Sequence, residues 1–362
     1  MARTLPSLPA FEDPRTASEL FWVKHQPFLE TQGFMLRPRY HPDWHPSWIL
    51  KDGTDLKAKY GFKVEDDNIF LHGSVLLDAT RMKDGVKVVL RMVPVGSQEL
   101  AMMEHLSSAD MVRDPRNRTV PILGIIPIPG EEKQRVFVVL PMLRVFNSPP
   151  FHCRREFADA FRQILEGIHF MHEHNIAHGD ACTSNFMMDA TGVCPRGFHI
   201  AYPHSYNGVY HVLHERPRCL VSPVSYYIID FETTRHFPAG RNDARATAMK
   251  CQIKNSPEFL CSPPLHNPFC LDVYNVGATF FRTCERYHGL DDFKPFFLTM
   301  MAEDPLFRPT TTTALEEFDT FMAAKDVIWM RSRIWPNDSL HKPPSRLVQF
   351  LWRKFPSLLP YF

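Results

Sequence analysis

Short apolar runs that suit β-strands dominate the chain between residues 61 and 143. The pair Asp84–Gly85 lies between two of these runs and predicts the turn of a β-hairpin. A helix is expected over 97–108, with Ser97 as its N-cap and its apolar side chains on one face. The predicted order is β-β-β-α-β-β, which describes a small twisted sheet with one helix. The apolar runs behind this prediction are 69–79, 86–93, 119–129 and 135–143.

From residue 144 onward the apolar positions recur at helical spacing. The longest example, 155–175, has apolar side chains every three or four residues and predicts a long amphipathic helix. A segment rich in Pro, His and Tyr, 190–225, then precedes an apolar strand at 224–230. Three further helices are expected at 271–284, 293–303 and 313–324.

The first 60 residues form an extension rich in Pro and Trp. Ser18 can cap a short helix over 19–34, and Pro27 would interrupt that helix. Its apolar side chains predict that the extension packs on the body of the protein. The organisation we expect is an extension, a sheet-rich unit, a helical unit and a tail, over 1–60, 61–143, 144–325 and 326–362.

Composition narrows the class of protein. The chain has 362 residues, enough for two structural units, and a net charge of +1, which gives no reason to expect nucleic-acid binding. No apolar run approaches the length of a membrane-spanning helix. The eight cysteines are scattered without a C-x-x-C pair, which favours a reducing compartment, cytoplasmic or nuclear. We expect a monomer.

The strongest chemical signal is the stretch HGDACTSNFMMD at 178–189, followed by IIDF at 228–231. Asp180 stands five residues before Asn185, and Asp230 ends an apolar strand further along the chain. A carboxylate that can take a hydroxyl proton, together with an amide and a carboxylate oxygen for Mg²⁺, is what phosphoryl transfer requires.

These motifs resemble the eukaryotic protein kinase family over roughly 65–325. HGDACTSN resembles the kinase catalytic loop and DFE resembles the metal-binding DFG. Three further stretches of this chain, SPE, LDVYNVG and DPLFRPT, also resemble kinase motifs. They contain Glu258, Asp272 and Arg308, respectively. The phrase DPRNRTVPIL, the extension and the 155–175 helix are similar to a kinase-like family of mushroom-forming fungi.

The resemblance implies an α+β fold with two lobes, a small β-sheet N-lobe with one helix and a larger, mainly helical C-lobe. It also implies roles for individual residues. Asp180 is the catalytic base, His178 organises its loop, and Asn185 and Asp230 hold Mg²⁺. Arg91 stands at the position of the phosphate-binding lysine and pairs with the helix residue Glu99, while Glu258 pairs with Arg308. The nucleotide would contact Gly73, Val75, Leu140 and Met142.

Several positions depart from the kinase pattern. Asn68 and Phe70 replace the earlier glycines of the phosphate-binding loop, whose end would be Gly73 and Val75. The guanidinium of Arg91 is a poorer fit between two phosphates than an ammonium. Other departures are Gly179 in place of Arg, Cys182 in place of Lys and Glu232 in place of Gly, and a short chain between Asp272 and Arg308.

The function we expect is ATP-dependent phosphoryl transfer to a Ser or Thr hydroxyl of a protein, with impaired phosphate binding and with ATP and Mg²⁺ as cofactors. A pseudokinase that binds or scaffolds a protein partner is the main alternative. A small-molecule kinase of the aminoglycoside or choline type is a second alternative, because it shares the HGD-x-x-x-x-N and IDFE patterns.

Several other residues that could bind a metal, react or bind a membrane can also be explained by a purely structural role. His169, His172, His174 and His178 could bind a metal, but helical spacing places only His169 and His172 on one face. A second group, His199, His204, His211 and His214 with Cys194 or Cys219, could bind Zn²⁺, but its spacing matches no zinc signature and a surface loop is the favoured interpretation. Cys182 is a reactive thiol or a small packing residue. The tail 345–362 either folds back onto the body or binds a membrane surface.

Overall fold

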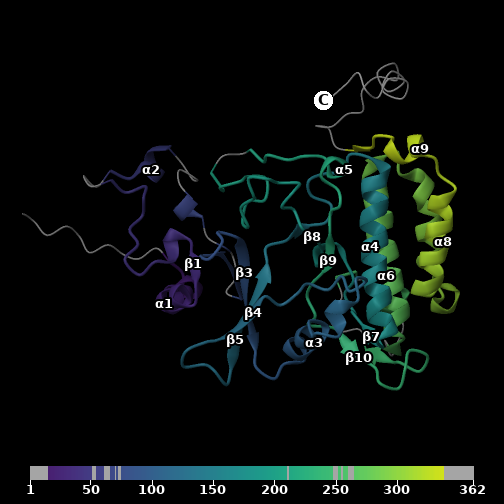
Figure 1. The fold of residues 1–362 in the computed structure, drawn as a ribbon, viewed down its shortest axis with the longest axis horizontal. Coiled ribbons are helices and arrows are strands. Elements are labelled where there is room, and N and C mark those ends of the chain that lie inside the picture. The colour runs from purple at the N-terminus through teal and green to yellow at the C-terminus, as the bar shows by residue number, and fades with distance from the viewer. Residues whose placement is uncertain are drawn as a thin grey trace, which may run out of the picture.

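In this computed structural model, a region dominated by a β-sheet and a region dominated by helices can be distinguished, as expected for the α+β class (Figure 1). A curled antiparallel sheet lies beside a group of long helices. No helix among the described residues combines the length and apolar character needed to span a bilayer. The structure describes residues 15–50, 54–60, 66–69, 71, 75–209, 212–247, 252–253, 256–259 and 265–337.

The main sheet has five strands in the order β1-β2-β3-β5-β4, and every neighbouring pair is antiparallel. Along the chain, β2, β3, α3, β4 and β5 follow the predicted β-β-α-β-β part of the order. The first strand, however, comes from the extension rather than from residues after 60. The strands are β1 Phe34–Leu36, β2 Leu76–Arg81, β3 Lys87–Pro94, β4 Gly124–Pro127 and β5 Arg135–Pro141.

The two faces of this sheet are buried against different partners. On β3, Val88 and Leu90 lie in a cluster with residues of the extension, and Phe137 of β5 lies in the same cluster. Val138 belongs to a second, larger cluster that includes side chains of the helical region. Arg91 pairs with Val138 in the register, so alternation along β3 places Arg91 on the face toward the helices.

The extension begins with α1, Ala17–Thr31. The expected cap at Ser18 is wrong, because Thr16 and Glu19 form a reciprocal capping box that starts the helix earlier. The expected break at Pro27 is also wrong, because the helix continues through it. Buried Trp22 lies before the proline and stacks on Phe137 of the sheet, which anchors the helix despite the missing hydrogen bond.

The long connection from β1 to β2, residues 37–75, carries short elements and buried polar contacts. Buried Arg39 donates to Glu19 of α1, with Nη2 3.1 Å from Oε2. Buried Asp67 accepts from the Trp44 ring at 2.7 Å. The short elements are the 3₁₀ turns Pro38–Tyr40 and Asp66–Asn68 and the helix α2 Leu56–Tyr60.

After β3, the helix α3 Gln98–Leu106 confirms the predicted helix and its cap. The Leu100 N–H donates to Ser97 Oγ at 3.1 Å. The helix turns Leu100, Met103 and Leu106 into the larger cluster, so this face anchors α3 and presents Glu99 from the first turn.

The C-terminal region is mainly helical, as predicted, and a cluster of aromatic rings fills its centre. Phe161 of α4 lies 4.9 Å from Phe280, 4.9 Å from Phe297 and 4.6 Å from Phe318, measured between ring centroids. These rings come from four helices, so the cluster fixes the helices to one another. The helices are α4 Arg154–Glu173, α5 Arg218–Val221, α6 Pro268–Glu285, α7 Lys294–Met300, α8 Thr311–Ala323 and α9 Val327–Arg331.

Small sheets and 3₁₀ turns complete this region. Strands β6, β8 and β9 form one sheet, and the pairs β7–β10, β11–β12 and β13–β14 form three others. The strands are β6 Arg144–Val145, β7 Ile176–Ala177, β8 Phe186–Met188, β9 Tyr226–Ile228, β10 Arg235–His236, β11 Ala246–Thr247, β12 Leu265–His266, β13 Tyr287–His288 and β14 Trp335–Pro336. The turns are Met111–Arg113, Thr183–Asn185, Pro257–Phe259, Asp291–Phe293 and Pro305–Phe307.

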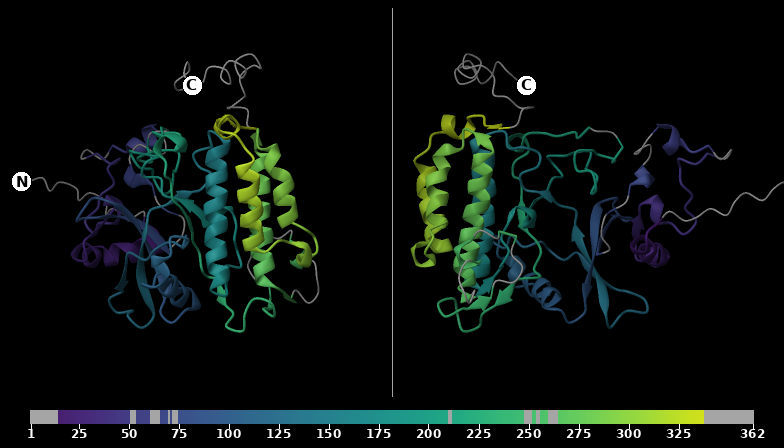
Figure 2. Two further views of the ribbon diagram at one scale, coloured as in Figure 1. Left: turned by 45° about the vertical axis from the view of Figure 1, so that its right-hand side comes forward. Right: turned by 180° about the vertical axis from the view of Figure 1, so that it is seen from behind.

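Residues 189–225 connect β8 to β9 and reach the extension, as both views in Figure 2 show. The His199 Nε2 atom lies 3.0 Å from Asp66 Oδ1, and His199 is buried. Gly208 has φ +82°, a backbone conformation that favours glycine, and a Cβ there would lie 2.5 Å from the end of the Ile69 side chain. The segment is therefore more than a surface loop.

An ion pair between Glu258 and Arg308 joins the segment before α6 to the turn before α8, as predicted. The Arg308 side chain is fully buried and that of Glu258 is 3 % exposed. Arg308 also donates to the Ala302 carbonyl at 2.8 Å and lies over the Tyr274 ring. The guanidinium is therefore satisfied on several sides, which a buried charge requires.

We expect Arg308→Ala to lower the free energy of unfolding by about 3–5 kcal/mol, because it leaves the Glu258 carboxylate buried without its partner. Urea denaturation followed by circular dichroism would measure the change. The control is Arg113→Ala, which removes an exposed ion pair with Asp110 and should cost less than about 1 kcal/mol. Equal losses in the two variants would contradict this role for the buried pair.

Candidate functional site

The loop that carries the predicted base is organised by His178. Its Nδ1 accepts the Asp180 N–H at 3.2 Å, and its Nε2 lies 3.0 Å from the Ile229 carbonyl. Together these bonds require a neutral ring with its proton on Nε2. His178 is completely buried and packs on the ring of Phe231, 5.9 Å away. One imidazole thus links the loop to the segment that carries Asp230.

A second anchor comes from Asp272 of α6, which is fully buried. Its two carboxylate oxygens accept the backbone N–H groups of His178 and Gly179, each at 2.8 Å. The ring of His172 lies 3.0 Å from the same carboxylate. Gly179 has φ +81°, and a Cβ there would lie 3.0 Å from the Thr233 carbonyl. The glycine is therefore required by the loop conformation.

Asp180 and Asn185 are in direct contact. The Asn185 Nδ2 atom donates to the Asp180 backbone carbonyl at 2.8 Å and to its Oδ2 at 3.2 Å. The Gln252 N–H donates to Asp180 Oδ1 at 2.8 Å. Because the amide nitrogen faces Asp180, the Asn185 Oδ1 is the atom that remains for another ligand, and Ser184 Oγ lies 3.3 Å from it. No pattern in the sequence predicts the contact between Gln252 and Asp180.

Asp230 lies two residues after the end of β9, which pairs with β8 beside Asn185. The Ile229 N–H donates to the Asn185 carbonyl at 2.9 Å, which brings Asp230 next to the Asp180 loop. Asp230 has φ +68°, a left-handed conformation that Asp tolerates better than most residues. Such conformations cluster at functional sites. Oxygen ligands thus come from the start of β8 and the end of β9.

Arg91 connects the sheet to this group of oxygens. Its Nη2 lies 2.7 Å from Glu99 Oε1 and 3.3 Å from Asp230 Oδ1. Arg91 donates a hydrogen bond to Asp230 Oδ1. The buried Glu99 Oε1 accepts no hydrogen bond, so the contact between Arg91 and Glu99 is an ion pair without hydrogen-bond alignment. Burial raises the pKa of Glu99, Arg91 lowers it and the charge of Asp230 raises it, and the net shift is upward.

The residues predicted to contact a nucleotide are placed only in part. Leu140 pairs with Val89 near the end of β5 and is half-buried, as is Met142. Val75 is 52 % exposed and immediately precedes Leu76, which pairs with Arg91. Gly73 and Phe70 lie outside the described residues, as does the side chain of Asn68.

Cys182 packs in a small buried cluster with Ile253 and Tyr274. Burial raises the pKa of its thiol to about 11, so the thiol stays protonated near neutral pH. The packing interpretation of Cys182 is therefore favoured over the reactive one.

The predicted histidine metal sites do not assemble among the described residues. His169 bonds to Thr311 and His172 to Asp272, while His199 bonds to Asp66 and His214 to Arg196. His211 and the tail 338–362 lie outside the described part of the chain.

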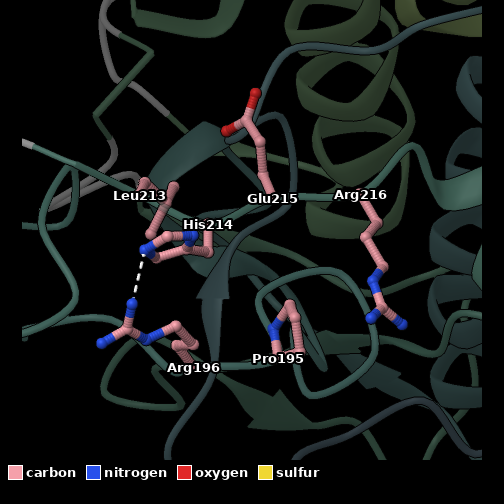
Figure 3. Close-up of a pocket in the computed structure, with 6 residues that line it drawn as sticks. All are labelled: Pro195, Arg196, Leu213, His214, Glu215 and Arg216. Atoms are coloured by element: carbon pink, nitrogen blue, oxygen red, sulfur yellow. Dashed lines mark hydrogen bonds between the residues drawn. The ribbon is translucent and has the colours of Figure 1, made fainter. Parts of the chain in front are cut away.

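The segment between β8 and β9 contains an open pocket of about 590 Å³ that sequence reasoning did not foresee (Figure 3). His214 accepts a hydrogen bond from Arg196 at 2.8 Å within it. Its walls combine two arginines with one glutamate and two apolar side chains. The lining residues are Pro195, Arg196, Leu213, His214, Glu215 and Arg216.

The upward shift of the Glu99 pKa predicts a pH-dependent stability. A group whose pKa is raised on folding contributes stability that is present below its unfolded pKa and is lost as pH rises through its folded pKa. Glu99→Gln stays neutral, so its melting temperature relative to the original chain should rise from about pH 4 to about pH 7. Thermal unfolding at both pH values would measure this difference.

The matched control is Glu104→Gln, an exposed carboxylate on the same helix, which should change stability by less than about 0.5 kcal/mol. If the melting temperature of Glu99→Gln relative to the original chain instead decreases from pH 4 to pH 7, the Arg91 contact, and not burial, determines the shift of the Glu99 pKa.

Comparison with known proteins gives no family for this site. No family model matches the chain, and no curated protein matches it. Its function must therefore be inferred from the geometry of the site itself.

Proposed function

We propose that this chain is a protein kinase-like phosphotransferase that moves a phosphoryl group from Mg·ATP to a Ser or Thr hydroxyl of a protein. The observation that carries the proposal is the group of side chains around Asp180. Asn185 contacts Asp180 directly, and Asp230 lies just beyond β9, the strand that pairs with β8 next to Asn185. Asp272 and His178 fix the loop from the buried side. These are the residue types and roles that the kinase catalytic loop requires.

The fold supports the same assignment. The five-stranded sheet with α3 corresponds to an N-lobe, and the helices from α4 to α8 correspond to a C-lobe. The pair Arg91–Glu99 joins β3 to α3, as in the lysine–glutamate pair of kinases. The pair Glu258–Arg308 ties the segment before α6 to the late helices. We infer a two-lobed kinase-like architecture from these four correspondences.

In this proposal each side chain has one task. Asp180 orients the acceptor hydroxyl and takes its proton, and its carboxylate is held ready by the Gln252 N–H. Asn185 Oδ1 and the Asp230 carboxylate are hard oxygen donors that fit Mg²⁺. Arg91 offers positive charge to phosphate oxygens. Bound Mg·ATP would supply the transferable phosphoryl group and the charge that neutralises it.

Three features weaken phosphate binding. Residues 37–75 connect β1 to β2 where a kinase has a short glycine-rich turn. Arg91 is already engaged by Asp230, at 3.3 Å. Cys182 offers no positive charge at the position of the catalytic-loop lysine. Losing one well-aimed donor costs about 3–4 kcal/mol of transition-state stabilisation, so slow transfer is expected.

The second candidate function is a pseudokinase, a binding module that does not transfer phosphate. The contact between Arg91 and Asp230 favours it, because the guanidinium satisfies a carboxylate that the metal would need. The small-molecule kinases are disfavoured, because they lack the counterpart of the buried Glu258–Arg308 pair.

The test is transfer of labelled phosphate from ATP to mixed proteins by the original chain, Asp180→Asn and Arg91→Lys at equal concentration. If the chain transfers phosphate, Arg91→Lys should raise the rate ten- to a hundred-fold, about 1.4–2.8 kcal/mol of transition-state stabilisation, because an ammonium fits between two phosphates better. Asp180→Asn should abolish labelling.

The outcomes separate the candidates. Labelling that survives Asp180→Asn would come from a contaminant. Labelling absent from all three folded proteins, together with no rise in melting temperature with millimolar Mg·ATP, would leave the pseudokinase. Labelling of small alcohols instead of proteins would favour the small-molecule class.

A further inference from the structure

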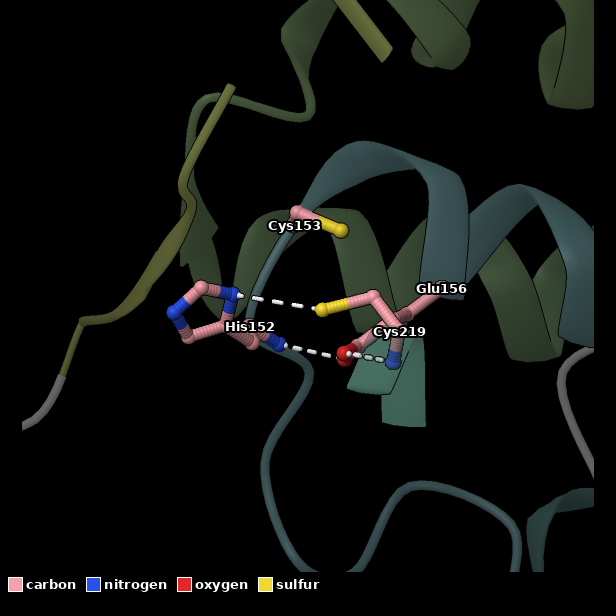
Figure 4. Close-up of side chains that lie close together, drawn as sticks. All are labelled: His152, Cys153, Glu156 and Cys219. Carbon is pink, nitrogen blue, oxygen red and sulfur yellow. Dashed lines mark hydrogen bonds between the residues drawn. The ribbon is translucent and has the colours of Figure 1, made fainter. Parts of the chain in front are cut away.

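Four metal-binding side chains meet where α4 begins beside α5 (Figure 4). His152, Cys153 and Glu156 come from the start of α4, and Cys219 comes from α5. One donor atom from each residue lies within 4.8 Å of all the others. The Cys219 Sγ lies 4.0 Å from His152 Nδ1. The two segments are more than sixty residues apart in sequence, so the juxtaposition is a product of the fold.

These distances are close to those of a tetrahedral zinc site. With Zn–S bonds of about 2.3 Å and Zn–N or Zn–O bonds of about 2.0–2.1 Å, neighbouring ligand atoms lie roughly 3.3–3.8 Å apart. The observed cluster, with every separation at or below 4.8 Å, needs a contraction of about 1.5 Å at most. Side-chain rotation supplies a movement of that size without a change in the backbone.

The backbone around the cluster is already fixed without an ion. Glu156 accepts the His152 N–H at 2.7 Å and the Cys219 N–H at 2.8 Å, so it joins the two segments that carry the ligands. Buried Arg218 donates to the Pro149 carbonyl at 2.7 Å and lies over the Phe151 ring. A site with this support needs little ordering when a metal binds.

We propose that His152, Cys153, Glu156 and Cys219 form a structural Zn²⁺ site. The donor set is two thiolates, an imidazole and a carboxylate, which matches zinc among the common metals. The charge also balances: two thiolates and Glu156 contribute three negative charges, and Zn²⁺ with Arg218 contributes three positive charges. The Arg218 Nη1 lies 3.7 Å from Glu156 Oε2, close enough to serve this role.

The two thiol sulfurs lie within 4.8 Å of each other before any metal binds. Cys153 is the N-cap of a 20-residue helix and makes no capping hydrogen bond, so its sulfur is available and the helix dipole favours its thiolate. Binding Zn²⁺ would release both thiol protons to solvent.

The site would hold the segment between β8 and β9 to the start of α4. It lies at the end of α4 opposite His172, which contacts Asp272, the residue that anchors the loop of Asp180. A metal here therefore stabilises the fold without entering the proposed phosphoryl transfer, and the two proposals fail or succeed separately. In the sequence only the neighbours His152 and Cys153 hint at it, because Cys219 has no nearby partner to complete a zinc spacing.

The test uses the full chain, kept reduced, treated with a chelator and then titrated with Co²⁺ or Zn²⁺ alone. We expect one equivalent of Co²⁺ to give tetrahedral visible bands and a thiolate-to-metal charge-transfer band, and Zn²⁺ to displace it. Zn²⁺ should raise the melting temperature and release about two protons per ion. Cys219→Ser, on an exposed side chain, and Cys153→Ser should lose the charge-transfer band or reduce it strongly.

Cys270→Ser is the matched control, because Cys270 is a free, partly buried thiol outside the cluster, and it should bind metal as the original chain does. His152→Ala should weaken Zn²⁺ binding about ten- to a hundred-fold or more while leaving sulfur ligation visible. Absence of the charge-transfer band in the original chain would overturn the proposal. So would equal metal binding by Cys219→Ser, or a Cys153–Cys219 disulfide in air with no metal uptake by the reduced protein.

Discussion

The candidate site depends on one buried carboxylate, that of Asp272. It is fully buried, and its oxygens accept two backbone N–H groups from the loop 178–179 and contact the ring of His172. A buried carboxylate without such donors would cost several kcal/mol, so the loop is held in the conformation that supplies them. Through this one group, α4, α6 and the loop that carries Asp180 are fixed to one another.

The sheet adds a second constraint. Alternation along β3 sends Val88 and Leu90 toward the extension and Arg91 toward the helices, so the strand cannot slip by one residue without burying the guanidinium against α1. The extension therefore contributes to the site although it lies on the far face. By filling that face with Trp22 and its neighbours, it fixes the register that aims Arg91 at Asp230.

Features of the structure could be predicted from the sequence where a single local pattern or motif determines them. The 155–175 helix, the Ser97 cap and the Glu258–Arg308 pair follow from periodicity, capping chemistry and a family motif, and the structure has all three. The α1 cap was misplaced because Ser18 and Thr16 are equally good caps, and only the Glu19 carboxylate decides between them. The edge strand β1 was missed because its three residues carry too little pattern.

Long-range polar contacts between residues that belong to no recognisable motif could not be predicted. His199 meets Asp66 across more than a hundred residues, and the Gln252 N–H reaches Asp180 from a segment with no motif. Such contacts depend on how finished elements are placed, and each polar group has many partners of equal chemistry. The His152–Cys219 cluster belongs to the same class, since its donors are brought together only by the position of α5.

The choice between enzyme and pseudokinase depends on which of the features that oppose phosphate binding can rearrange when Mg·ATP binds. Arg91 and Asp230 are 23 % and 30 % exposed, and an ion pair that partly faces water contributes only about 1 kcal/mol. A bound metal could therefore displace the guanidinium toward Glu99, which is 2.7 Å away and lacks a hydrogen bond on its nearer oxygen. The connection 37–75 is different, because its ion pair with Glu19 of α1 and its internal hydrogen bond between Trp44 and Asp67 are both buried. Under the proposed phosphotransfer, the connection 37–75, more than the Arg91 contact, is therefore expected to limit how tightly phosphate is held.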